Sequence, residues 1–188
     1  MSKPTSVVLL CEDNLTSAFV RAYLRHCGVL YGVRVNVTQS GSGYDWVLRQ
    51  FPIEVNAYRL AKARKSSWLI AVIDADTGTV ARRLSQLQAS LGQSEEPRVR
   101  SINLRNEMIA CLVPRRNIET WILVLSGTSA NEEDDYKNTK SRDEWAEMQS
   151  SASGQLYAWA RPNARLPANC IDSILLAIRE LARLETSN

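Results

Sequence analysis

The chain has 188 residues, of which 45% are hydrophobic and 23% are charged, proportions that are usual for a globular protein with one domain. No apolar run approaches the roughly 20 residues that a membrane-spanning helix needs, and the formal net charge of +3 is too small to indicate a partner. The opening residues MSKPTS lead directly into an apolar run, so we expect no signal peptide and a cytoplasmic location.

Strand and helix signals alternate along the chain. Apolar or alternating runs predict strands at residues 6–11 (SVVLLC), 33–37 (VRVNV), 68–74 (WLIAVID) and 108–114 (MIACLVP). Capping residues and apolar positions at helical spacing predict helices over about 14–27, 44–65, 78–92, 117–125, 143–160 and 169–186. A bend is expected at Pro52, and loops are expected over 92–101 and 126–143.

Four strands alternating with helices predict an α/β fold with a mainly parallel four-stranded sheet and helices on both faces. We interpret the chain as a single domain whose core covers about residues 5–125. The last helices form a C-terminal extension over about residues 140–188. Dimerisation, docking of a partner and a contribution to the core all remain open for this extension.

Charged side chains follow three of the four predicted strands. They are Glu12 and Asp13 after the first strand, Asp74 and Asp76 after the third, and Arg115, Arg116 and Glu119 after the fourth. Ligands of parallel sheets gather at the carboxyl ends of the strands, so we expect these groups to converge. Carboxylates are hard oxygen ligands for Mg²⁺ or Mn²⁺, and their repulsion is costly without a cation.

The metal-binding and catalytic roles are assigned first to Glu12, Asp74 and Asp76. Glu119 or Asp13 could complete a second metal site, although Asp13 also suits a helix cap and Glu119 a first helical turn. Two metals could orient a phosphodiester, activate water and stabilise the leaving oxygen.

The substrate-binding roles fall to basic and small polar residues. Arg115 and Arg116 could grip the scissile phosphate, with Arg116 acting on transition-state charge, or could form ion pairs with the site carboxylates. Ser42 lies in a GSG turn at residues 41–43, where a helix start could hold a phosphate.

Two other phosphate chemistries fit these acids less well. A phosphoacceptor receiver domain often opens like LLCEDN, but 62 residues separate Glu12 from Asp74, more than receivers have. In addition, PRRNIE follows the fourth strand, where a receiver has Thr or Ser. A haloacid-dehalogenase phosphatase needs Thr or Val where DADTGT has Gly78, and needs the motif on its first strand.

The segments VVLLCEDN, AVIDADTG and PRRNIETW together resemble the Toprim family over residues 7 to about 125. The likeness is to small Toprim-like proteins and OLD-type nucleases of bacterial defence or mobile elements. It implies a metal-dependent nuclease that acts on DNA or RNA, with Glu12 in the glutamate position and Asp74 and Asp76 as the DxD pair.

The same resemblance leaves partners and activity open. The chain has no GxxxxGK[ST] sequence, so an ATPase partner would be a separate polypeptide. A catalytically inactive Toprim-like module that binds such an ATPase or a nucleic acid is the alternative, which the modest charge favours. Self-association also stays open.

Overall fold

The structure is a computed structural model that describes residues 4–38, 43–168 and 170–186. It contains a four-stranded, all-parallel sheet in the order β2-β1-β3-β4. The strands are β1 (Ser6–Cys11), β2 (Val33–Val37), β3 (Ser67–Val72) and β4 (Ile109–Leu112). The helices are α1 (Asn14–His26), α2 (Gly43–Ala61), α3 (Val80–Gly92), α4 (Pro97–Arg100), α5 (Ile118–Leu125), α6 (Arg142–Ala160) and α7 (Asp172–Thr186), with a 3₁₀ turn, η1, at Leu104–Asn106.

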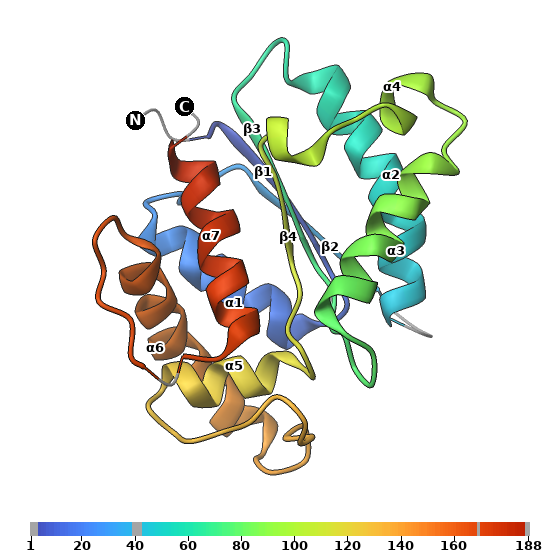
Figure 1. The fold of residues 1–188 in the computed structure, drawn as a ribbon. Coiled ribbons are helices and arrows are strands. Elements are labelled where there is room, and N and C mark those ends of the chain that lie inside the picture. Colours follow the sequence, from blue (N-terminus) through green and yellow to red (C-terminus); the bar gives the residue numbers. More distant parts are fainter. Residues whose placement is uncertain (1–3, 39–42, 169, 187–188) are drawn as a thin grey trace.

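Helices cover both faces of the sheet, as Figure 1 shows. Side chains alternate across each strand, so Leu9 and Ile70 pack into the core beneath α1, α5, α6 and α7. Leu10 and Leu69 point the other way, toward α2, α3 and α4. The predicted α/β fold with a parallel sheet and two helical layers is confirmed.

Of the two C-terminal helices, α7 packs against β4, and α6 packs on the outer side against α1, α5 and α7. Apolar residues of α6 and α7 belong to the same cluster as the strands and α1, among them Leu156 and Leu181. Arg183 of α7 also reaches the edge of the sheet, where it donates to the backbone oxygens of Glu107 and Ile109. No helix in the described ranges is both long and apolar enough to cross a membrane.

The segment predicted as a loop after α3 contains regular structure. Pro97 begins the short helix α4, a position where its fixed backbone angle and missing N–H are tolerated, and the buried Val99 fixes this turn against α2 and α3. The long helix α2 runs through Pro52 and ends at Ala61, before the predicted limit near residue 65.

Candidate functional site

The strand order brings the acidic segments together. Strands β1 and β3 are neighbours, with Cys11 opposite Val72, so Glu12 and Asp74 leave the sheet side by side. The backbone N–H of Asp74 donates to Oε1 of Glu12 at 2.7 Å. Beyond β4, Ala75 N–H still donates to Pro114 O at 2.9 Å, which keeps the PRRNIE segment beside the aspartates.

Asp74 is the most buried carboxylate of this edge, with 2% of its surface exposed. Burial raises its pKa well above the ordinary value, and the neighbouring Glu12, Asp13 and Glu119 carboxylates raise it further, while Lys137 opposes them. A carboxyl group held in this way gains from a cation more than an exposed one does.

Glu12 lies between Asp74 and the start of α2. Burial raises its pKa to about 7, against the opposing hydrogen bond from the Asp74 amide. A Cβ atom added to Gly43 would come within 2.9 Å of both Cβ and Oε2 of Glu12. The start of α2 can therefore approach the Glu12 side chain this closely because residue 43 is a glycine.

Gly43→Ala is expected to displace the Glu12 carboxylate and to weaken Mn²⁺ binding about tenfold or more, because misplacing one oxygen ligand weakens a metal site. Calorimetric titration with Mn²⁺ measures the effect. Gly92→Ala is the matched control, because nothing lies within 4 Å of a Cβ there. Equal Mn²⁺ affinity in the two variants would show that the close contact does not position Glu12.

Asp76 occupies the outer side of the site. Its backbone is left-handed, with φ of 52°, and its side chain is 43% exposed, 3.8 Å from the guanidinium of Arg83. Arg83 is itself buried, donates from Nε to the backbone oxygen of Asp74 at 2.9 Å, and stacks over the ring of Tyr44 at 4.4 Å. Arg83 therefore links the two aspartates.

Glu119 and Asp13 contribute from helix starts. Asp13 caps α1, accepting from the N–H of Thr16 at 2.8 Å, while Asn117 caps α5. Glu119, in the first turn of α5, is 8% exposed, and burial raises its pKa. Its Oε2 atom is buried with no hydrogen-bond partner among the described residues. An acceptor in this state calls for a proton or a cation.

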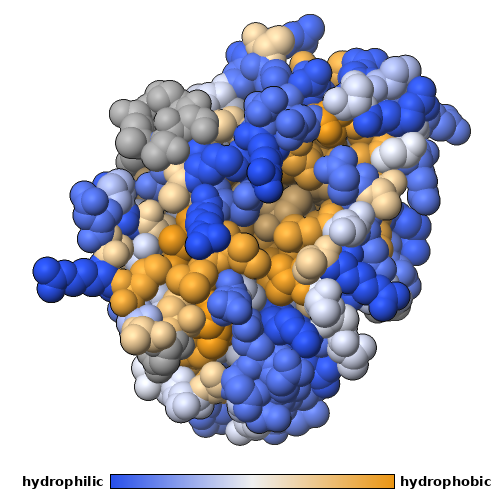
Figure 2. Space-filling model, in the orientation of Figure 1, coloured by the Kyte–Doolittle hydropathy of each residue, from blue (hydrophilic) through white to orange (hydrophobic). Residues whose placement is uncertain are grey.

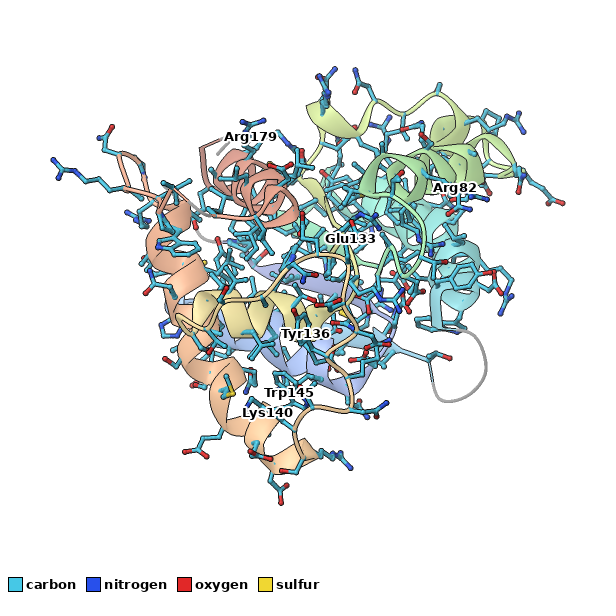
Figure 3. The ribbon with its side chains drawn as sticks, turned by 60° about the horizontal axis from the view of Figure 1, so that its bottom comes forward. Arg82, Glu133, Tyr136, Lys140, Trp145 and Arg179 are labelled. Atoms are coloured by element: carbon cyan, nitrogen blue, oxygen red, sulfur yellow. The ribbon has the colours of Figure 1, made fainter. Side chains whose placement is uncertain are left out.

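Residues 126–141, between α5 and α6, form what we call the acidic loop, which crosses this end of the molecule with Glu133 and Tyr136 (Figure 3). Two of its carboxylates face the arginines: Glu133 lies 3.2 Å from Arg115, and Asp135 lies 3.6 Å from Arg116. Lys137 of the same loop points to the acids, 3.9 Å from Oδ2 of Asp74.

Lys137 is the loop's cation among these carboxylates. Burial alone would lower its pKa, but the surrounding Asp74, Asp76, Glu119 and Glu12 raise it above the ordinary value. The lysine therefore supplies, in this structure, part of the positive charge that the acids require.

Lys137→Met is expected to tighten Mn²⁺ binding roughly tenfold, because the ammonium group competes with a metal for the same carboxylates. Titration calorimetry at low and high salt measures the change, and Lys140→Met, on the same loop, serves as the control. Weaker Mn²⁺ binding in Lys137→Met would instead mean that the lysine holds the site together.

The predicted site residues thus separate into two groups. Glu12, Asp13 and Glu119 lie close enough to Asp74 to raise its pKa, whereas Arg115 and Arg116 lie around them with charged partners of their own. Asp76 lies on the outer side beside Arg83, but it still helps to raise the pKa of Glu12. Ser42 lies outside the described residues. Within residues 4–38, 43–168 and 170–186, no three His, Cys, Asp or Glu side chains stand together as a group that could hold a metal ion.

Sequence reasoning missed two residues, Arg83 and Lys137. Arg83 had a readable signal, because it lies beside Leu84 and Leu87 on the apolar stripe of a predicted helix, where a charge needs a buried partner. Lys137 had none, since it lies in a polar loop without periodicity. Comparisons give no further guide: no protein-family model, curated protein or solved structure matches the chain.

Proposed function

We propose that the chain is a metal-dependent, Toprim-type nuclease or related phosphodiester-processing enzyme that acts on DNA or RNA with Mg²⁺ or Mn²⁺. The observation that supports this most is the burial of Asp74 beside Glu12, Asp13 and Glu119 at the carboxyl end of the sheet. Burying several acids together is costly, and a divalent cation is the usual reason for such an arrangement. A bacterial defence or mobile-element setting, with a separate ATPase, rests on the family resemblance alone.

The donors fit a hard cation by their chemistry. Asp74 and Glu12 would be the principal ligands, and Glu119 brings a buried oxygen that has no hydrogen-bond partner among the described residues. Asp76 would contribute from the outer side. Because three such side chains are not already gathered in the described residues, binding requires the carboxylates to move. A bound divalent cation would supply Lewis-acid stabilisation of charge on a phosphodiester.

The basic residues would position the substrate. Arg115 and Arg116, whose side chains are 22% and 24% exposed, pair with Glu133 and Asp135, whose side chains are 77% and 47% exposed. Contact of these carboxylates with water weakens the pairs. A substrate phosphate could therefore replace these carboxylates on the arginines. Arg83 would keep Asp76 and the Asp74 backbone in place.

The alternative is a catalytically inactive module that binds a nucleic acid or a partner ATPase. One observation favours it: the described residues contain no ready-made group of three metal ligands. The receiver alternative is less well supported, since a phosphoacceptor aspartate must be open to its donor and Asp74 is 2% exposed.

The two main functions are separated by a cleavage assay. Wild-type protein is incubated with plasmid, linear and single-stranded DNA and with RNA, in Mg²⁺, Mn²⁺ or EDTA, and its melting temperature is followed in parallel. Metal-dependent cleavage supports the enzyme. A metal-dependent rise in melting temperature without cleavage of any substrate would point to the inactive module. With neither effect, the metal site is refuted.

A further inference from the structure

The outer edge of β4 carries backbone groups that no other strand covers. The register with β3 directs the backbone of Ala110 and Leu112 inward, so that of Ile109 and Cys111 points away from the sheet. Arg183 donates to the oxygen of Ile109 and thereby closes that half of the edge. The N–H and C=O of Cys111 have no hydrogen-bond partner among the described residues.

This edge forms the floor of a groove of about 550 Å³. Helices α3 and α7 line its two sides, and η1 contributes at one end, with Leu84, Leu176 and Leu104 as apolar contacts. Leu176 is 40% exposed. Figure 2 shows the corresponding apolar surface as a hollow orange area between polar rims. An exposed apolar area around open strand-edge groups is typical of a place where a further strand is added.

The groove suits a single extended segment better than a second copy of the chain. The β4 edge lies between two helical walls, and the same edge of a second copy would lie between its own walls, so two such edges could not approach to the roughly 4.8 Å of paired strands. An extended peptide without flanking helices can reach the floor.

The rim charges define the peptide. Arg105 and Arg179 line the groove and are exposed, and neither has an ion pair within the described ranges; Figure 3 shows Arg179 on α7 directed outward. The acid of the groove, Glu180, is already 2.8 Å from Arg183. The free charge of the groove is therefore positive, and the complementary partner is acidic.

We propose that the β4 groove binds an extended segment of a partner protein. Its backbone would face the floor, its apolar side chains would pack against the helical walls, and its acidic side chains would face Arg105 and Arg179. The segment would pair with the backbone of Cys111 as a fifth strand of the sheet. This binding does not depend on the proposed nuclease function, because it uses the side of the sheet and not its carboxyl end.

A display library of random nine-residue peptides, selected on the full chain, tests the proposal. Enriched peptides should alternate apolar and acidic residues. Leu176→Asp and Arg179→Glu should each weaken a selected peptide at least tenfold in fluorescence anisotropy, while Arg64→Glu, an exposed change after α2, should not. Peptide binding should slow hydrogen exchange at the Cys111 amide. Methylating alternate backbone nitrogens of the peptide should abolish its binding, because it removes the N–H groups that pair with β4.

Circular dichroism melts confirm that the variants are folded. The proposal is overturned if no peptide is enriched, or if enriched peptides bind the two groove variants as well as wild type. It also fails if sedimentation shows a dimer that Leu176→Asp disperses, because the occupant would then be a second copy of the chain.

Discussion

Asp74→Asn is expected to abolish metal-dependent cleavage while making the metal-free protein more stable. Asparagine keeps the shape of the side chain but removes the charge that burial and the Glu12 carboxylate disfavour. At neutral pH the aspartate ionises more readily in the unfolded chain than in the folded one, and this difference favours unfolding. Asparagine does not ionise, so the substitution removes this destabilising contribution. Cleavage should fall on the order of 10²–10³-fold or more, as it does when a principal electrostatic group of an active site is lost.

Urea unfolding in EDTA and the cleavage assay in Mn²⁺ measure these two effects separately. Asp143→Asn, an exposed change in the first turn of α6, should alter neither. A fall in cleavage together with a rise in stability is informative. If Asp74 had only a structural role, its substitution would make the protein less stable. An Asp74→Asn protein that is less stable and still cleaves would remove Asp74 from the catalytic site.

The metal-free protein is expected to lose stability as the pH rises from 4.5 to 7, and Glu12→Gln should remove part of this loss. The pKa of Glu12 rises from 4.5 to about 7 on folding, mainly through burial. A carboxyl whose pKa is higher in the folded state binds its proton more tightly there. The stability that it contributes is therefore complete below pH 4.5 and is lost as the pH passes through 7.

The contribution of Glu12 amounts to at most about 3 kcal/mol. Glu12→Gln should be more stable than wild type at pH 8 and should approach it near pH 4.5, since the glutamine oxygen can still accept from the Asp74 amide. Urea unfolding in EDTA at several pH values measures the difference, with Glu147→Gln on the exposed side of α6 as control. Adding Mn²⁺ should flatten the wild-type profile, because a bound cation favours the ionised carboxyl. A difference that does not vary with pH would contradict the assigned pKa.

Much of the fold could be predicted because its signals are local. The alternating segment VRVNV predicted a strand with the same bounds as β2. The apolar residues at helical spacing near the C-terminus predicted α7, which packs its apolar side into the core. The turn α4 was not predicted, since a single buried side chain, Val99, fixes it through contacts distant in sequence.

The candidate site was predictable to the extent that strand ends determine it. Parallel topology alone places Glu12 beside Asp74, because β1 and β3 are adjacent. The orientation of Asp76 was not predictable, because it depends on a left-handed backbone angle and on Arg83. The position of Lys137 depends on the path of a loop, for which the sequence offers no periodic signal.

The acidic loop has a thermodynamic consequence. It places an ammonium group on the aspartate and carboxylates on the arginines, so it resembles a metal at one end and a phosphate at the other. The metal and the nucleic acid would each have to displace part of the acidic loop. Once one of them has bound, the free energy needed to displace the loop no longer opposes binding of the other. Metal and nucleic acid would then bind with positive cooperativity, each raising the affinity of the other by the same factor.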